Sequence, residues 1–249
     1  MIELKKVSKV YGKKRALDQL DVNIKEGEIF GFLGHNGAGK STTIKSLVSI
    51  IEPTSGQILV DGQELKTHRQ EIKQKIGYVP DTPDLFLQLS AEEYWDLLGA
   101  AFELSDELKQ ERVEQLTALF ELTAQRYDTI SSLSHGMRQK VIVIGALLSD
   151  PDIWILDEPM QGLDPQAAYD LKQLMQEHAR KGKTVIFSTH DLATAQQLCD
   201  KLAILKKGQL IYNGTLTELM SQYPEKSLED IYLSMAGRQG LLKAGEADE

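Results

Sequence analysis

The residues most able to do chemistry begin at position 34. Residues 34–41 read GHNGAGKS, which fits the pattern G-x-x-x-x-G-K-[ST] at every fixed position. Glycines at 34, 37 and 39 let the backbone turn tightly, because a Cβ would block either the required φ or the close approach of an anion. The pattern predicts a phosphate-binding loop, with contacts expected from Gly34, His35, Asn36, Gly37, Ala38, Gly39, Lys40, Ser41 and Thr42.

Two side chains at the end of this loop have distinct predicted roles. Lys40 would bring a positive charge to the β- and γ-phosphates of a nucleotide, and the Ser41 hydroxyl would ligate Mg²⁺. The apolar run at 29–33 predicts a buried strand that enters the loop, and residues 42–48 predict a helix that leaves it. Free N–H groups and the helix dipole at the start of that helix favour an anion.

A pair of adjacent carboxylates follows a second apolar strand at 152–156. Open α/β sheets bind ligands at the carboxyl ends of their strands, so we expect Asp157 and Glu158 to lie at the ligand-binding edge. Asp157 would hold the Mg²⁺ shell, while Glu158 would polarise a water molecule for in-line attack on the γ-phosphorus. An acidic helix N-terminus is the structural alternative.

Three further residues are candidates for the same site. His190 ends a predicted strand and can hydrogen-bond both a γ-phosphate and the catalytic carboxylate, although a lone histidine can also be purely structural. Asp164, in the sequence GLDP at 162–165, is predicted to cap the following helix, and such a cap is compatible with a place in the site. Tyr11 lies beside a basic run at 13–15 and either stacks on a base or packs as an ordinary aromatic residue.

The elements that position these residues follow an α/β pattern. With 249 residues and 41% apolar content, the chain suits one α/β domain with an inserted lobe. Strand signals occur at 2–7, 20–24, 29–33, 57–62, 76–79, 152–156, 184–187, 202–205 and 209–211. Helices are predicted at 42–52, 91–102, 106–120, 137–148, 165–180, 191–200 and 228–235.

The spacing of these signals predicts a division of the chain. Two prolines at 80 and 83 end a strand, and the pattern then changes to amphipathic helices with almost no strand signal. We therefore expect an α/β core at 1–83 and 151–220 and a helical subdomain at 84–150. The remaining region, 221–249, is expected to hold one helix and a flexible tail.

Charge and cysteine content argue against several classes of protein. The formal net charge of −9 and the pI near 5.2 argue against a surface that neutralises nucleic-acid backbones. Cys199 is the only cysteine, so no intrachain disulfide can form and a reducing compartment is expected. No run approaches the ~18 apolar residues that span a bilayer, so work at a membrane would require another subunit to supply the span.

Taken in order, the motifs resemble those of ABC-transporter ATP-binding subunits. The resemblance covers about residues 2–219 and rests on Tyr11, residues 34–41, LSHGM at 133–137, Asp157 with Glu158, GLDP at 162–165 and His190. It implies a P-loop NTPase core of the ABC ATPase type, with an N-terminal antiparallel β region and an inserted helical subdomain. It also implies ATP and Mg²⁺ as ligands, Tyr11 as the adenine-stacking residue and His190 as the switch histidine.

The resemblance further implies a mechanism that requires two cassettes. Two identical copies, or this chain and a paired ATPase subunit, would face head to tail, so that Ser134 and Gly136 of one cover ATP bound by the other. Ser134 would cap the following helix, and Gly136 would let its N–H groups approach a γ-phosphate. Binding and hydrolysis of ATP would drive an integral membrane permease subunit, which would hold the chain at the cytoplasmic face of the membrane. No nucleic-acid partner is expected.

Three positions depart from the family's usual sequences. The usual signature is LSGGQ, whereas His135 here replaces the first glycine and Met137 the glutamine, so we expect a weaker cover over ATP. The loop that normally reads VPQ carries Asp81 in place of the glutamine. Asp81 can still reach Mg²⁺, directly or through water, but it changes the charge at the site.

Within the family, the sequence is most similar to bacterial Ecs-type and related ABC-2-like exporter ATPases. This similarity rests on Asp81 and on the segments 136–141, 189–195 and 228–233, and it implies export of a peptide, lipid or drug. We expect the permease to dock near residues 81–89. Two other functions stay open: a soluble ABC-type ATPase that acts on ribosomes or DNA, and a regulatory nucleotide-binding module with low turnover.

Overall fold

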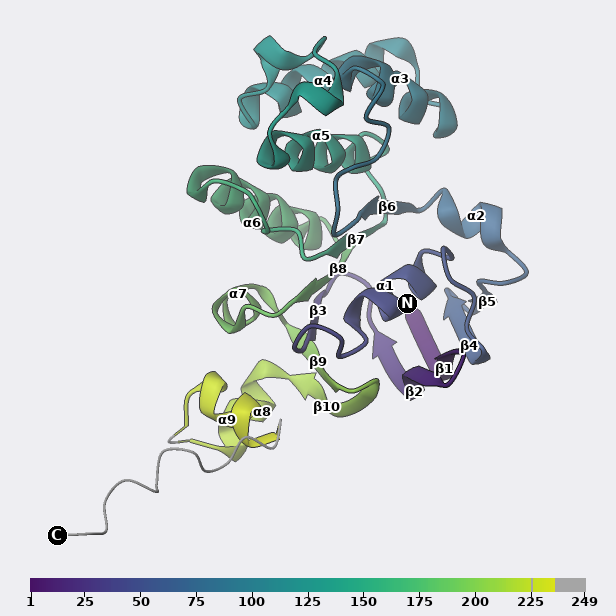
Figure 1. The fold of residues 1–249 in the computed structure, drawn as a ribbon, viewed down its shortest axis with the longest axis vertical. Coiled ribbons are helices and arrows are strands. Elements are labelled where there is room, and N and C mark those ends of the chain that lie inside the picture. The colour runs from purple at the N-terminus through teal and green to yellow at the C-terminus, as the bar shows by residue number, and fades with distance from the viewer. Residues whose placement is uncertain (225, 236–249) are drawn as a thin grey trace, which may run out of the picture.

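The strands of the protein form two sheets (Figure 1). The structure, a computed structural model, describes residues 1–224 and 226–235. The smaller sheet is antiparallel and has the order β2-β1-β4-β5. Its strands are β1 (Ile2–Tyr11), β2 (Lys14–Ile24), β4 (Ser55–Val60) and β5 (Gln63–Glu64). The predicted N-terminal antiparallel β region is therefore confirmed.

The larger sheet has the order β10-β9-β3-β8-β7-β6. Its strands are β3 (Ile29–Leu33), β6 (Ile76–Val79), β7 (Ile153–Asp157), β8 (Thr184–Thr189), β9 (Lys201–Lys206) and β10 (Gln209–Thr215). Only β10 runs antiparallel to its neighbour, and the other pairs are parallel. Every residue of β3, β7 and β8 is buried, which explains their continuous apolar runs, because strands covered on both faces need not alternate.

Helices cover both faces of the larger sheet. Helix α1 (Lys40–Leu47) packs between the two sheets, where Ile44 and Leu47 join one apolar cluster. On the opposite face, α6 (Pro165–Arg180) and α7 (Leu192–Leu198) contribute to a second cluster. Helices α8 (Leu216–Gln222) and α9 (Leu228–Met235) lie next to β10. The helical segment between β6 and β7 lies at the opposite end of the molecule (Figure 1).

Helices dominate the segment between β6 and β7. It contains α3 (Ala91–Ala101), α4 (Asp106–Leu119) and α5 (His135–Leu147), with short 3₁₀ turns at Thr123–Gln125 and Ile130–Ser132. Ser90 caps α3 in a reciprocal box with Glu93, and Ser105 caps α4. Trp95 is fully buried and donates its indole N–H to the carbonyl of Val141 at 3.0 Å, which ties α3 to α5.

Some element boundaries differ from the predictions. Helix α1 ends at Leu47 and not near 52, because Ser49 has φ +57 and the N–H groups of Ile50 and Ile51 turn back to the carbonyl of Lys45. Strands β1 and β2 extend into the predicted basic loop, which is therefore a tight turn. The short helices α2 (Arg69–Lys73) and α8 were not predicted. Among the described residues, no helix combines the length and apolar character needed to cross a bilayer.

Candidate nucleotide-binding site

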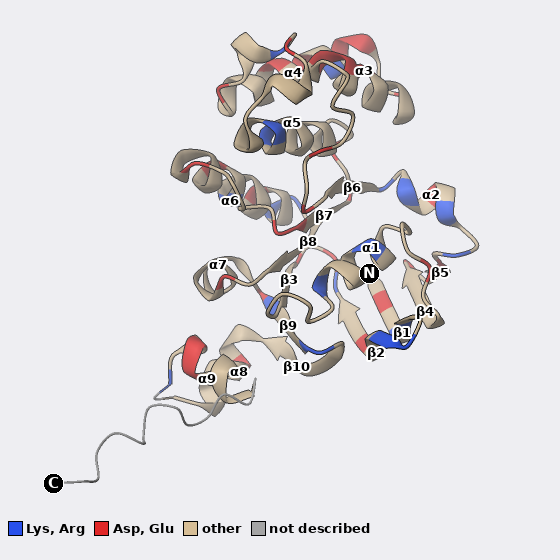
Figure 2. Cartoon of the chain, viewed as in Figure 1, with Lys and Arg blue, Asp and Glu red and all other residues tan. Residues whose placement is uncertain are grey.

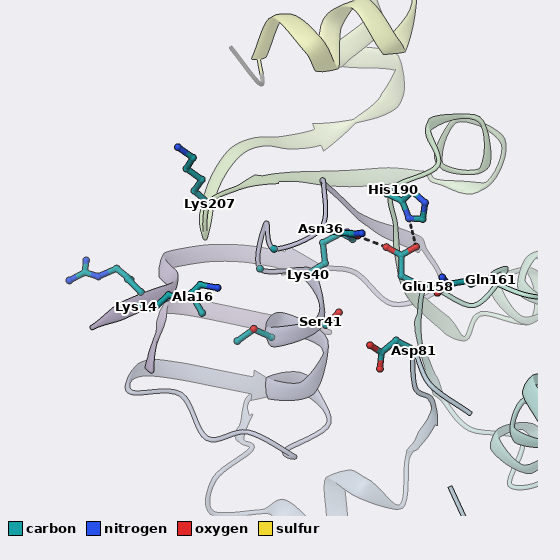
Figure 3. Close-up of a pocket in the computed structure, with 14 residues that line it drawn as sticks. Lys14, Ala16, Asn36, Lys40, Ser41, Asp81, Glu158, Gln161, His190 and Lys207 are labelled. Carbon is teal, nitrogen blue, oxygen red and sulfur yellow. Dashed lines mark hydrogen bonds and ion pairs between the residues drawn. The ribbon is translucent and has the colours of Figure 1, made fainter. Parts of the chain in front are cut away.

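A cavity of about 500 Å³ opens beside the phosphate loop, defined here as residues 34–41 (Figure 3). Its volume is in the range of small-molecule sites. The lining residues come from the phosphate loop, from β2 and from the carboxyl ends of β6, β7, β8 and β9, which matches the edge where open α/β sheets bind ligands. They are Lys14, Arg15, Ala16, Asn36, Gly37, Gly39, Lys40, Ser41, Thr42, Asp81, Glu158, Gln161, His190 and Lys207.

The backbone of the phosphate loop requires its glycines. Gly37 and Gly39 have φ of +79 and +114, a region that side-chain-bearing residues rarely adopt. A Cβ on Gly34 would lie 2.7 Å from the carbonyl oxygen of Leu205. Helix α1 begins at Lys40, and in the described part of the chain no side chain caps its N-terminus. Its first N–H groups are therefore available to an anion.

Lys40 is buried at the base of the cavity. Its Nζ donates to the carbonyl of Gly34 at 2.6 Å and to that of His35 at 3.4 Å. The same ammonium lies 3.1 Å from Oε1 of Glu158, with which it forms an ion pair. Such charge-assisted contacts hold the ammonium in one position inside the loop. The anionic partner of Lys40 in this structure is thus Glu158.

Glu158 follows β7 in a strained backbone conformation. Its φ of +48 lies in the left-handed region, which costs a non-glycine residue roughly 1–2 kcal/mol. The N–H of Glu158 donates to Oγ of Ser188 at 3.0 Å, which holds this conformation. Its Oε2 lies 2.9 Å from Nδ1 of His190, so the carboxylate bridges Lys40 and His190 (Figure 3).

Asp157 lies beside Ser41 beneath the cavity. Its Oδ1 accepts hydrogen bonds from Oγ of Ser188 at 2.5 Å and from Oγ of Ser41 at 3.1 Å. Burial raises the pKa of Asp157 above its usual value, and the two hydroxyl donors oppose this shift. Among the described residues, none donates a hydrogen bond to Oδ2, although this atom is buried. A buried carboxylate oxygen without a protein partner is a position for a cation or water.

Asp81, the third predicted metal ligand, is paired with a cation of α1. It follows β6 and the proline at 80, and its Oδ1 lies 3.5 Å from Nζ of Lys45. Both side chains are about one third exposed, so solvent weakens the attraction. Asp81 lines the same cavity as Ser41 and therefore belongs to the same site.

Four of the residues predicted to contact the nucleotide lie outside the cavity lining: Tyr11, Gly34, His35 and Ala38. Tyr11 is 46% exposed and contacts Nζ of Lys9, which lies 5.2 Å from its ring centroid. The cavity is lined there by the first residues of β2, Lys14 to Ala16, and not by Tyr11 (Figure 3). His35 turns to the other side of the phosphate loop, where its ring meets Tyr232.

The predicted signature residues gather on another surface. Ser134 accepts a hydrogen bond from the N–H of Met137 at 3.3 Å, and thus caps α5 as predicted. Asp164 caps α6 through the N–H of Ala167 at 2.9 Å and also pairs with Lys140 at 2.9 Å. A Cβ on Gly136 would lie 2.5 Å from the carbonyl oxygen of Gly162. The segments 133–137 and 162–165 are thus packed together, and Ser134, Gly136 and Asp164 do not line the chain's own cavity.

Sequence reasoning missed several lining residues. Lys207, at the turn between β9 and β10, is brought close because the N–H of Gly208 donates to the carbonyl of Ala38 at 2.8 Å. Gln161 lines the cavity from the segment after Glu158. Neither residue belongs to a motif, and only the Lys-Gly pair at 207–208 carried a local turn signal. The basic run at 13–15 is visible in the sequence, but the sequence predicts a nucleotide contact only for the neighbouring Tyr11.

Two curated relatives align with nearly the whole chain. The ABC-type transporter ATP-binding protein EcsA of Bacillus subtilis is 34% identical over 237 residues, which cover 94% of this chain and 96% of that protein. The Nod factor export ATP-binding protein I of Cupriavidus metallidurans is 32% identical over 232 residues, which cover 93% of this chain and 77% of that protein.

Solved structures agree with these relatives. The structure of an ATP-binding subunit of an ABC transporter matches with a TM-score of 0.89 and 34% identity, and covers 94% of this chain and 99% of that one. A dimeric ATP-binding cassette in a post-hydrolysis state, bound to ADP and Pi, matches with a TM-score of 0.79 and 29% identity, covering 87% and 99% of the two chains. The family model described as ABC transporter matches residues 17–161. The chain therefore belongs to the ABC transporter family, in which it is an ATP-binding subunit and an ATPase.

Proposed function

We propose that the chain hydrolyses Mg-ATP as one half of a head-to-tail pair of cassettes and thereby drives a membrane exporter. The observation that carries the proposal is the position of Glu158, whose carboxylate lies between Lys40 of the phosphate loop and His190. The arrangement supports the proposal because a carboxylate, an ammonium and an imidazole lie together in one cavity next to the phosphate loop.

In this proposal, the side chains of the cavity divide the chemistry among them. The phosphate loop and Lys40 bind the β- and γ-phosphates through N–H groups and charge. Glu158 accepts the proton of the attacking water, and His190 orients Glu158 and donates a hydrogen bond to the γ-phosphate. Because Lys40 now pairs with Glu158, the phosphates must compete for Lys40, and their binding would release Glu158 to act as base.

The residues present fit a magnesium ion. Asp157 offers a buried oxygen that lacks a protein hydrogen-bond donor among the described residues, and Oγ of Ser41 lies 3.1 Å from its other oxygen. Magnesium is commonly held by one or two carboxylates together with the phosphates of the substrate. Ser41 and Asp157 would hold the ion, and Asp81, which lines the same cavity, would contribute directly or through water. When bound, Mg²⁺ would neutralise charge on the β- and γ-phosphate oxygens.

A second cassette would complete the site. Ser134, Gly136 and Asp164 lie on a surface outside the chain's own cavity, where they are free to cover the ATP of a partner. The dimeric state of the related cassette bound to ADP and Pi supports this arrangement. Tyr11 remains the candidate for stacking on adenine, with the basic wall of Lys14 and Arg15 beside it.

The direction of transport is proposed from relatives and the docking site from exposed apolar residues. The relative with the name Nod factor export ATP-binding protein I supports export, and we propose a peptide, lipid or drug as cargo. Leu85 and Phe86 are exposed large apolar residues between β6 and α3, within the segment 81–89 where the permease would dock. Through that subunit the chain would lie at the cytoplasmic face of the membrane.

The solution mass of Glu158→Gln protein, with and without Mg-ATP, tests this proposal. The amide introduced by this substitution cannot accept the proton of water, so ATP would stay bound between two cassettes. We expect the mass to double only when ATP is present. If the protein binds ATP with high affinity but its cassettes never pair, either alone or with the membrane subunit, the result would favour a regulatory nucleotide-binding module. A Lys40→Ala variant that binds ATP normally would contradict the role of the phosphate loop.

A further inference from the structure

The C-terminal helix α9 contacts the phosphate loop through Tyr232. Its residues Leu228, Ile231 and Tyr232 follow the spacing of one helix face and are all buried in the core cluster formed with α6 and α7. Glu229 and Asp230 face outward, and α9 accordingly carries an acidic outer surface in Figure 2. One face of this helix, which the sequence predicts within the C-terminal region 221–249, therefore packs into the core of the protein.

The contact between α9 and the loop is a pair of aromatic rings. The rings of Tyr232 and His35 have centroids 5.0 Å apart and an interplanar angle of 68°, an edge-to-face arrangement. A second cavity of about 230 Å³ lies between the loop and α9, lined by both rings and by Leu205 and Ile211. The phosphate loop is thus incompletely packed on the side that faces α9. The ring of Tyr232 is one of the groups that contact the loop on that side.

His35 in turn fixes the part of the loop that holds Lys40. Its carbonyl accepts the N–H of Ala38 at 3.0 Å and Nζ of Lys40 at 3.4 Å. A displaced His35 would therefore change both the curvature of the loop and the position of the ammonium. His35 is itself exposed, so its own burial does little to hold it.

We propose that Tyr232 is a positioning residue for nucleotide binding, which holds His35 and with it the phosphate loop in the conformation that binds phosphate. The inference rests on the proposed role of Lys40 and the loop. A loop that visits other conformations binds with an affinity reduced by the fraction of competent molecules. From the strength of an aromatic pair, loss of the contact would weaken ATP binding about three- to tenfold.

Titration with trinitrophenyl-ATP tests the inference on the full chain. We expect Tyr232→Leu, which stays apolar but loses the ring, to bind about three- to tenfold more weakly. Its KM for ATP should rise by the same factor, with little change in kcat. Tyr232→Phe should restore most of the affinity because it restores the ring. The matched control is Tyr223→Leu, since Tyr223 packs against the same core from the end of α8 but contacts Lys226.

A double-mutant cycle separates the ring contact from a loss of structure. His35→Ala alters an exposed loop residue and should weaken binding as much as Tyr232→Leu. In the His35→Ala background, Tyr232→Leu should have little further effect. Amide hydrogen exchange of residues 35–39 should be faster in Tyr232→Leu and His35→Ala, and unchanged in Tyr223→Leu.

Two outcomes would overturn the inference, and a third would refute the role on which it rests. Wild-type affinity in folded Tyr232→Leu or in His35→Ala would show that the contact does not position the loop. Fully additive losses in the double variant would show that Tyr232 acts elsewhere than through His35. If Lys40→Ala binds trinitrophenyl-ATP as wild type does, the proposed role of the phosphate loop itself fails.

Discussion

At the scale of single residues, charges are balanced around the buried carboxylate of Asp157. Burial raises the pKa of Asp157, the hydroxyl groups of Ser188 and Ser41 lower it, Asp81 raises it and Lys45 lowers it. Asp81 and Lys45 are themselves an ion pair at 3.5 Å, so together they bring little net charge to the site. We infer that Lys45 compensates the acidic residue that stands here in place of the family's usual amide.

Replacement of either member of this pair should change the requirement for magnesium. Lys45→Met leaves an extra negative charge near the site and should lower the Mg²⁺ concentration that half-saturates nucleotide binding, by about two- to fivefold. Asp81→Gln should raise it by a similar factor. The double variant should return close to wild type, because the pair is neutral. Titrations of Mg²⁺ at constant ATP measure this, and a shift of both single variants in the same direction would refute it.

Asp157 should reduce stability in the nucleotide-free protein. Because its folded pKa lies above the unfolded value of 3.8, ionisation opposes folding, and stability falls as the pH rises from 3.8 through the folded pKa. At pH 7, Asp157→Asn should therefore raise Tm by roughly 2–6 °C. The difference from wild type should shrink as the pH falls below the folded pKa. Thermal unfolding from pH 4 to 8 measures it, and a lower Tm at pH 7 would contradict this account.

At the scale of elements, three helix starts carry candidate site residues, and small residues set the distances between segments. Helices α1, α5 and α6 begin at Lys40, at His135 after Ser134, and at Pro165 after Asp164. The N-terminus of α5 approaches the turn at 162 so closely that only hydrogen fits at Gly136. The shape of the surface that would meet a partner cassette thus depends on the absence of a side chain at Gly136.

Gly136→Ala should separate binding from turnover. Its Cβ would lie 2.5 Å from the carbonyl of Gly162, so α5 or the turn must move, at about 1–3 kcal/mol of stability. We expect the monomer to keep its affinity for ATP. We expect the ATPase rate to fall at least tenfold, which corresponds to a loss of ~1.4 kcal/mol or more of transition-state stabilisation. Gly99→Ala in α3 is the control, because its Cβ meets only the flexible chain of Lys109. Equal rates for both variants would refute the prediction.

At the scale of the whole molecule, the nucleotide site lies between two regions that are far apart in the sequence. The helical segment stands at one end of the molecule and α8 with α9 at the other (Figure 1). The segment from β6 to α3 joins the cavity, through Asp81, to the exposed Phe86. A partner that binds Phe86 would therefore sit five residues along the chain from Asp81, which is a proposed magnesium ligand.

Phe86→Asp should release the chain from the proposed membrane subunit. Phe86 is 50% exposed, and a charge there would be buried in any interface that covers it. We expect the fraction of tagged protein that sediments with membranes to fall, while affinity for ATP stays unchanged. Tyr127→Asp is the control, because Tyr127 is 74% exposed elsewhere in the helical segment. Loss of ATP binding, or equal release of both variants, would contradict the proposed docking site.

The sequence by itself determined the local chemistry. The phosphate loop, the strand that ends at Asp157 and the caps at Ser134 and Asp164 were predicted from residue types, because their hydrogen bonds and φ angles are satisfied within a few residues. The buried strands of the larger sheet were predicted from continuous apolar runs, because strands covered on both faces carry apolar residues throughout. The predicted ABC ATPase type of fold was confirmed by the solved structures.

Tertiary structure alone decided which distant side chains meet. The contacts between Lys40 and Glu158, Lys45 and Asp81, and His35 and Tyr232 join residues from different elements, and no periodicity or spacing encodes them. Lys207 reaches the cavity only because a turn between strands hydrogen-bonds to the phosphate loop. Such contacts depend on the order of strands and the packing of helices, which are set by burial across the whole chain and not by any local motif.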